Sequence, residues 1–203
     1  IEIQRLTKAF LKDPVKVEVA PPSTTVDKID QRVLFVDREN KGALLKSMLE
    51  DETIERALIF ARTKHGANKI VKNLSKGKIK ADAIHGNKSQ AARLLALNNF
   101  KTGKVRVLVA TDIASRGIDV DGITHVINYE LPNEPESYVH RIGRTARAGM
   151  TGDAISFCSE LEIKKLRAIE KLINTRIKTK NYLTTKSTKI RETENKDSEG
   201  YLY

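Results

Sequence analysis

The segment YVHRIGRTARAG, residues 138–149, carries Arg141, Arg144 and Arg147 at intervals of three, with His140 just before them. Like charges at neighbouring helix positions repel one another by about 0.2–0.5 kcal/mol per pair, and the two glycines of the segment weaken a helix. Guanidinium groups bind phosphate oxygens through paired hydrogen bonds that lysines do not reproduce. The pattern therefore favours phosphate recognition over a solvated surface.

A second segment, VATDIASRGIDV, leaves a predicted buried strand and then presents Thr111, Gly117 and Asp119. A hydroxyl group and nearby backbone N–H groups suit phosphate oxygens, whereas a carboxylate suits a ribose hydroxyl. The glycine lets the backbone approach a ligand or turn sharply. Taken alone, the segment fits equally well a strand, a turn capped by aspartate and another strand.

Two further segments place polar residues directly after predicted strands. IFARTK offers Thr63, and HGNKSQAAR offers Gly86, followed by Gln90 and Arg93 three positions apart on one helix face. Because helix N-terminal amides attract anions, nucleic-acid phosphates suit these positions. Taken singly, Thr63 also fits an ordinary helix cap, and Gln90 and Arg93 fit an ordinary surface.

The composition favours a polyanionic partner such as nucleic acid. The 203 residues include 37 Lys and Arg against 26 Asp and Glu, a net charge of +11. One cysteine, Cys158, excludes a disulfide framework, and the histidines lack metal-ligand spacing, so no metal site is expected. The sequence has no apolar run of about 18 residues and does not open with a signal peptide, which predicts a soluble, cytoplasmic protein with no membrane partner.

The scaffold that positions these residues is predicted from alternating periodicity. Short apolar runs predict strands at 32–36, 56–61, 80–85, 105–111, 124–129 and 153–158. Amphipathic stretches predict helices at 41–49, 64–74, 89–100, 135–143 and 161–173. The alternation predicts an α/β fold with a doubly wound, mostly parallel sheet between helical layers. Ligands in such sheets bind at the carboxyl ends of the strands.

The two ends of the chain differ from this rhythm. Residues 1–31 begin with a helical pattern and continue as a proline-containing extended stretch, as expected for the end of a preceding domain and a connector. The main domain is predicted at 32–173, and the Lys-rich and Thr-rich residues 174–203 predict a basic, flexible tail. A start at Ile1 rather than Met indicates a piece of a longer protein.

The four segments, in this order, resemble the second RecA-like domain of superfamily 2 helicases, specifically the DEAD-box RNA helicases. IFARTK resembles motif IV, HGNKSQAAR the segment after it, VATDIASRGIDV motif V and YVHRIGRTARAG motif VI. Four ordered motifs are more specific than any single pattern. HRIGRTARAG is most similar to the bacterial RhlE-like branch. Motif VI commonly has glycine where this chain has Ala146, which leaves the arginines and the histidine in place.

The resemblance implies a three-layer RecA-like domain that closes with a first RecA-like domain around ATP and single-stranded RNA. Arg144 and Arg147 match the arginines that reach the nucleotide, and Asp119 matches the residue that contacts the ribose. His140 and Arg141 match positions that couple the site to the first domain. The positions that line the RNA backbone path are matched by Thr63, Gly86, Gln90, Arg93, Thr111 and Gly117.

Two motifs of a complete helicase are missing. The chain has no G-x-x-x-x-G-K-[ST] loop and no DEAD tetrapeptide, so ATP and Mg²⁺ are expected to be bound mainly by the first domain. The chain alone is expected to be inactive, whereas the parent protein would hydrolyse ATP and unwind RNA, with salt-sensitive backbone contacts. Two alternatives remain: half of a superfamily 2 DNA helicase or translocase, or a stand-alone, non-enzymatic RNA-binding module.

Overall fold

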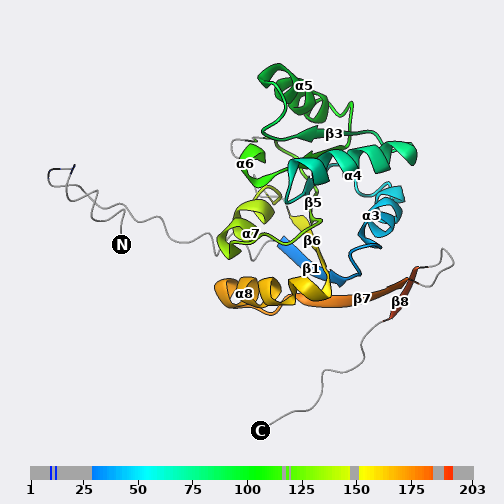
Figure 1. Cartoon of the computed structure of the whole chain (residues 1–203), viewed down its shortest axis with the longest axis vertical. Helices are drawn as coiled ribbons and strands as arrows, with labels where there is room; N and C mark the ends of the chain where they lie inside the picture. The colour runs from blue at the N-terminus through cyan, green and yellow to red at the C-terminus, as the bar shows by residue number, and fades with distance from the viewer. Residues whose placement is uncertain are drawn as a thin grey trace, which may run out of the picture.

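The computed structural model describes residues 10, 12, 29–115, 118, 120–146, 151–184 and 190–193, with residues 183, 184 and 190–193 described by their backbone alone. One sheet has the strand order β3-β4-β2-β5-β6-β1-β7-β8 (Figure 1). Its strands are β1 (Ile29–Phe35), β2 (Ala57–Phe60), β3 (Ala81–Ile84), β4 (Val107–Ala110), β5 (His125–Asn128), β6 (Gly152–Cys158), β7 (Lys178–Thr184) and β8 (Ile190–Thr193). The helices are α3 (Lys41–Glu50), α4 (Lys64–Lys76), α5 (Gln90–Lys101), α6 (Asp112–Ser115), α7 (Pro135–Ile142), the 3-10 turn η1 (Glu160–Glu162) and α8 (Ile163–Ile173).

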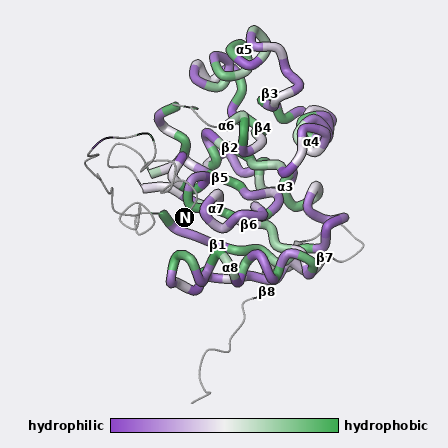
Figure 2. The backbone as a smooth tube through the Cα atoms, turned by 60° about the vertical axis from the view of Figure 1, so that its left-hand side comes forward, coloured by the Kyte–Doolittle hydropathy of each residue, from purple (hydrophilic) through white to green (hydrophobic). Residues whose placement is uncertain are grey.

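The sheet is parallel from β3 to β7, and β8 runs antiparallel to β7. The sequences ALIF of β2 and VLVA of β4 are buried throughout, as central parallel strands covered on both faces require. Figure 2 shows hydrophobic residues along β4 and alternating hydropathy along α8. The prediction of a doubly wound, mostly parallel sheet is confirmed.

Helices cover both faces of the sheet. Leu58 of β2 belongs to the apolar cluster that includes Phe100 of α5, whereas the next residue, Ile59, belongs to the cluster with Leu44 of α3 and Ile70 of α4. Because successive strand residues point to opposite faces, α3 and α4 form one layer and α5 lies in the other. A third cluster joins α7 and α8 to the α5 side of β1 and β6.

The sheet extends beyond the predicted domain. β1 starts at Ile29, and β7 pairs with it in register from Arg32↔Lys178 to Phe35↔Asn181. The prediction of a flexible tail from residue 174 is therefore wrong for β7. Its sequence KTKNYLT is mostly polar because β7 lies near the sheet edge, so hydrophobic periodicity gave little signal. The helix predicted near the N-terminus lies outside the described residues, apart from Phe10 and Lys12.

The described helices are too short or too polar to cross a membrane.

Candidate functional site

Arg141 on α7 is 2% exposed and connects three strands at their carboxyl ends. Its Nε and Nη2 donate to the two carboxylate oxygens of Asp112 at 2.5 and 2.8 Å. Its Nη1 donates to the Asn128 side-chain oxygen at 3.0 Å and to the Glu130 carbonyl at 2.8 Å. The guanidinium carbon lies 4.9 Å from the ring centre of Phe60. We call these five residues the arginine clamp, since they hold α7 against the ends of β2, β4 and β5.

Helix α7 begins where its sequence predicts. Pro135 occupies a first-turn position and Glu136 places negative charge near the N-terminus, both favourable there. Tyr138 and Ile142 are buried with Arg141, whereas His140 is exposed. The clamp thus turns one face of α7 inward and leaves His140 on the outer side.

The segment after α7 is held on the start of β6. Thr145 is 1% exposed, and its hydroxyl donates to the carbonyls of Ile123 and Thr124 at 2.5 and 3.2 Å. A Cβ atom at Gly152 would lie 2.0 Å from the Thr145 hydroxyl oxygen, so glycine is needed there for close approach. Arg144 donates from Nη1 to the Ile118 carbonyl at 3.1 Å. These contacts anchor the backbone that leads to the third arginine.

Ala146 adopts a φ of 54°, in the left-handed region. L-residues other than glycine adopt this conformation at a cost of roughly 1–2 kcal/mol. This geometry accounts for the glycine that motif VI commonly has at this position. Such strain tends to gather near functional sites. Arg147, which follows directly, lies outside the described residues, as do Gly117 and Asp119.

Three predicted RNA-binding residues follow neighbouring strands. Gly86 follows β3, Thr111 follows β4 and Thr63 follows β2, and these strands are adjacent in the order β3-β4-β2. Because the strands are parallel, the three residues lie at the same edge of the sheet. We call this row the track edge. A Cβ atom added at Gly86 would meet no described atom within 4 Å, so the backbone there is open to a ligand.

Helix caps fix the local geometry of the track edge. The Thr63 hydroxyl oxygen accepts a hydrogen bond from the Gly66 N–H at 3.0 Å, and the Ser89 hydroxyl oxygen accepts one from the Ala92 N–H at 3.2 Å. The cap that the sequence suggested for Thr63 is therefore present. On α5, Arg93 donates to the Gln90 side-chain oxygen at 3.3 Å, so the two predicted residues share one face.

His85 ties the Gly86 loop to α4, a role that sequence analysis missed because an isolated histidine is a weak signal. It is 2% exposed, and its Nε2 lies 3.0 Å from the Asn68 side-chain oxygen. Burial and then the charges of Lys88 and Lys64 lower the pKa of His85, so its neutral form is favoured. In that form Nε2 is the donor to Asn68, since an amide oxygen only accepts. Lys64 adds a second tie, donating to the Asn87 side-chain oxygen at 3.0 Å.

A second buried cation, Lys41, lies behind the arginine clamp. Its Nζ donates to Glu162 at 2.5 Å and to the carbonyls of Tyr129 and Phe157 at 3.0 and 3.2 Å. Glu162 also accepts from the Ser159 hydroxyl at 2.7 Å, within a capping box. We call this group the lysine cage. The S-x-x-E spacing of Ser159 and Glu162 predicts the capping box in this group, whereas no local sequence pattern marks Lys41.

A reactive cysteine and a metal site receive little support in the part of the chain that is described. Burial, as the main cause, raises the pKa of the Cys158 thiol to about 11, so it stays protonated at neutral pH. Among the described residues, no three His, Cys, Asp or Glu side chains gather to hold a metal ion. The polar groups that converge are the clamp and the track edge.

Comparison with known proteins places this arrangement in a family. The family model described as the helicase conserved C-terminal domain matches residues 40–149. The DEAD-box ATP-dependent RNA helicase CshA of Bacillus subtilis is 44% identical over 168 residues, which are 83% of this chain and 34% of CshA. The chain thus spans about a third of the length of the curated relatives it matches. The RhlE-like branch is not confirmed and stays a prediction.

Two solved structures of similar fold are bound to RNA. S. cerevisiae Dbp5 bound to RNA and ADP BeF3 has a TM-score of 0.79 at 28% identity, covering 89% of this chain and 48% of that chain. Mss116p DEAD-box helicase domain 2 bound to an RNA duplex has a TM-score of 0.68 at 29% identity, covering 78% of this chain and 66% of that one. The chain therefore belongs to the helicase conserved C-terminal domain family, and it is similar to the corresponding part of DEAD-box RNA helicases.

Proposed function

We propose that this domain supplies arginines to ATP and part of an RNA backbone track in an ATP-dependent RNA helicase. The observation that carries the proposal is the arginine clamp. It buries Arg141 against Asp112 and thereby sets the direction of α7 at the carboxyl edge of the sheet. Arg144 lies on the anchored segment, and Arg147 follows it three positions later in the sequence; both are proposed to meet a triphosphate held by a facing domain.

The donor set fits a nucleotide triphosphate. Guanidinium groups match phosphate oxygens in geometry and charge, and phosphoryl transfer depends mainly on positioning and charge stabilisation. In this proposal Arg144 and Arg147 contact ATP, Asp119 contacts the ribose, and His140 and Arg141 couple this site to the first domain. When bound, ATP supplies the phosphoryl group whose transfer drives the cycle. Mg²⁺ is assigned to the facing domain, because this chain lacks the DEAD tetrapeptide.

The track edge supports RNA as the second ligand. Thr63, Gly86 and Thr111 follow adjacent strands, and hydroxyl and backbone N–H groups bind phosphates without reading sequence. Gln90, Arg93 and Gly117 are assigned to the same path from the motif resemblance. Dbp5 and Mss116p are bound to RNA in the similar structures, which favours RNA over the DNA alternative. Activity is proposed for a protein that contains both halves.

Three sequence-based assignments stay proposals beside this one. The residues before β1 are proposed to end a preceding domain and connect it to this one. The domain predicted at residues 32–173 is proposed with its start moved to Ile29, where β1 begins, and with β7 added to its sheet. A cytoplasmic location rests on the sequence prediction alone.

The decisive test is RNA-stimulated ATP turnover by the full-length protein carrying Arg147→Ala. We expect turnover to fall by about 10³-fold while RNA binding is retained, because an arginine that stabilises transition-state charge is worth about 10³ to 10⁵ in rate. Arg176→Ala is the matched control, since Arg176 is 74% exposed and pairs with Glu170 at the opposite end of the sheet.

Two results would overturn the assignment. Turnover that is unchanged in Arg147→Ala would mean that the motif VI arginines serve binding or surface charge instead. Equal stimulation of the wild type by single-stranded DNA and by RNA would favour the DNA helicase alternative.

A further inference from the structure

Helix α4 has a larger excess of basic over acidic residues than α8, the helix that packs near the other end of the sheet. Its sequence KHGANKIVKNLSK has four lysines and no acidic residue, and Lys64 stands in the first turn, where the helix dipole disfavours a cation. The sequence IKKLRAIEKLI of α8 also has four basic residues, but it includes one acidic residue, Glu170, which pairs with Arg167 at 2.7 Å. The charge of α4 is therefore not balanced within the helix.

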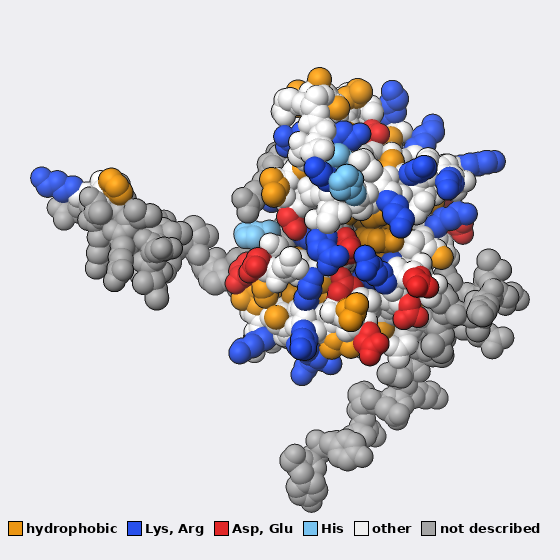
Figure 3. Space-filling view, in the orientation of Figure 1, with side chains coloured by type: hydrophobic (Ala, Val, Ile, Leu, Met, Phe, Trp, Pro, Cys, Tyr) orange, Lys and Arg blue, Asp and Glu red, His pale blue; other side chains and the backbone are white. Residues whose placement is uncertain are grey.

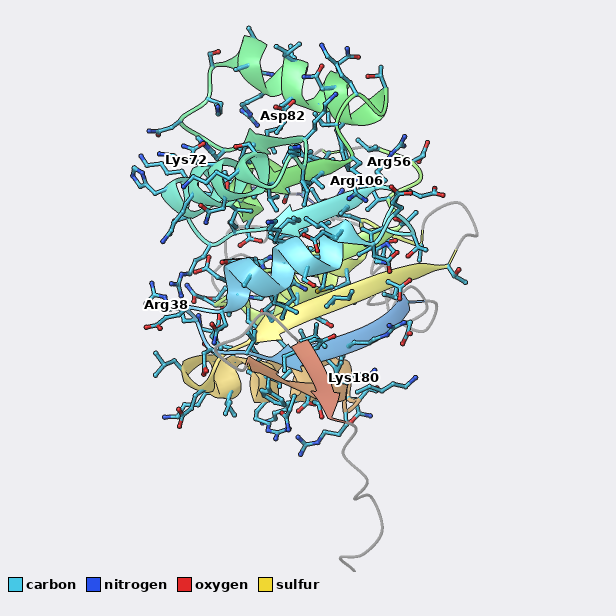
Figure 4. The ribbon with its side chains drawn as sticks, turned by 90° about the vertical axis from the view of Figure 1, so that its right-hand side faces the viewer. Arg38, Arg56, Lys72, Asp82, Arg106 and Lys180 are labelled. Carbon is cyan, nitrogen blue, oxygen red and sulfur yellow. The ribbon has the colours of Figure 1, made fainter. Side chains whose placement is uncertain are left out.

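The basic residues form a straight row. His65, Lys69, Lys72 and Lys76 follow the spacing i, i+4, i+7, i+11, which places them on one stripe opposite the buried side of α4. All four are exposed, and the row is about 16 Å long at 1.5 Å per residue. Figure 3 shows Lys and Arg side chains gathered over α4, and Figure 4 places Lys72 on the outer side of that helix. We call this row the α4 ridge.

The ridge lysines have no balancing partner within the described ranges. The amino groups of Lys69, Lys72 and Lys76 make no hydrogen bond and no ion pair with any described residue. Lysines three and four positions apart repel one another, so the row is unfavourable until counter-charge arrives. The ridge carries no Phe, Tyr or Trp, which suits phosphate contact rather than base stacking.

The ridge begins at the track edge. Thr63 caps α4, and Lys64 donates to Asn87 in the loop that follows Gly86 at 3.0 Å. The other end of the ridge leads away from the sheet's carboxyl edge along the helix axis. A nucleic-acid strand that lies on Thr63 and Gly86 can therefore continue over the ridge without leaving positive charge.

We propose that the α4 ridge binds the sugar-phosphate backbone of an RNA duplex that flanks the single-stranded segment on the track edge. This proposal rests on the proposed RNA function and adds a second surface to it. A straight row of lysines suits a duplex because duplex RNA is recognised mainly through its shape and its phosphates. Polyanionic charge alone would also suit an acidic protein, so the test includes one.

The test measures RNA binding by the 203-residue chain across a salt series. Two ligands are compared, a short single-stranded RNA and the same strand extended by an RNA duplex. The ridge variant Lys69→Gln/Lys72→Gln/Lys76→Gln is matched by Lys101→Gln/Lys164→Gln/Lys171→Gln, which removes the same charge from exposed lysines of α5 and α8. We expect the ridge variant to bind the duplex ligand about 10-fold more weakly with a salt slope lower by about 3, and the single strand within about 2-fold of wild type.

Each outcome decides the proposal. Equal weakening by the two triple variants would reduce the effect to net charge and overturn it, as would duplex binding that the ridge variant retains. Polyglutamate that binds wild type but not the ridge variant, with duplex RNA binding both alike, would reassign the ridge to an acidic protein. Failure of wild type to bind either RNA would overturn the ridge proposal and the RNA track assigned to this domain, and would leave the ATP role to the turnover test. Equal urea midpoints for the three proteins establish that folding is unchanged.

Discussion

Lys41 and Arg141 are two buried cations at the same edge of the sheet, each 2% exposed, and they are held differently. Lys41 pairs with Glu162, whose side chain is 9% exposed. Arg141 pairs with Asp112, whose side chain is 41% exposed. The lysine cage is therefore closed on all sides, whereas the arginine clamp ends at a carboxylate that a facing domain can reach. The two cations are equally buried, and the exposure of the partner carboxylate is what distinguishes the two networks.

The two networks share one stretch of backbone. Lys41 donates to the Tyr129 carbonyl, Arg141 to the Glu130 carbonyl, and Glu162 accepts from the Leu131 N–H at 3.2 Å. Three successive residues are thus bound by three charged side chains from α3, α7 and η1. Changes in the closed cage should therefore appear as lost stability, and changes in the open clamp as lost turnover.

The largest effect is expected from breaking the closed cage with Lys41→Met. We expect the free energy of unfolding to fall by about 3–5 kcal/mol, because the Glu162 carboxylate is left buried without its cation. Urea unfolding at neutral pH measures the change. Lys46→Met, an exposed lysine on the same helix, should cost less than about 0.5 kcal/mol.

The double variant Lys41→Met/Glu162→Gln should recover much of the loss, since removing both charges leaves neither one unpaired. If Lys41→Met cost no more than Lys46→Met, the cage would not be a stabilising unit.

A smaller effect of another kind is expected from Asp112→Asn in the open clamp. Solvent screens this exposed carboxylate, so the stability change should stay near about 1 kcal/mol. Turnover by the full-length protein should fall by about 10- to 100-fold, because small displacements of catalytic groups are costly. Asp121→Asn, an exposed aspartate at the amino edge, is the control. A turnover loss no larger than the loss of folded protein would contradict a positioning role for Asp112.

The smallest effect is a difference in acid sensitivity. Burial by itself would raise the pKa of Glu162, but the hydrogen bond and charge of Lys41, with the two bonds from Ser159, lower it below its usual 4.5. Because the folded pKa is the lower one, this stabilisation is complete above about pH 4.5 and is lost as the pH falls through the folded pKa. Wild type should therefore lose more stability than Glu162→Gln between about pH 5 and about pH 3. If urea unfolding showed equal losses of stability in wild type and Glu162→Gln, another carboxylate would account for the acid sensitivity.

The elements that sequence analysis predicted well are those with strong local periodicity. The strands β1 to β6 and the helices α3, α4, α5, α7 and α8 overlap the predicted ranges to within a few residues. The short helix α6 was missed because four residues carry no periodicity, and β7 because its sequence KTKNYLT is mostly polar. Both elements depend on packing against neighbours rather than on their own propensity.

The sequence likewise marked single site residues but not the contacts between residues that are distant in the chain. The sequence marked Arg141 through its motif, but not its pairing with Asp112 and Asn128, which lie 29 and 13 residues away. The buried bond of His85 to Asn68, which holds the Gly86 loop, also joins residues that no local pattern pairs. Partnerships of this kind arise when crossovers bring strand ends together, and no local spacing encodes them.

The sequence by itself determined the α/β rhythm, the excess positive charge and the four ordered motifs that identify the family, because each is a local or summed property of residue types. The tertiary structure decided which charges are structural and which face the site. It alone paired Lys41 with Glu162 across 121 residues and buried Arg141 while leaving His140 exposed. The physical reason is that burial and ion pairing depend on strand order and helix packing, which bring distant residues within a few ångströms.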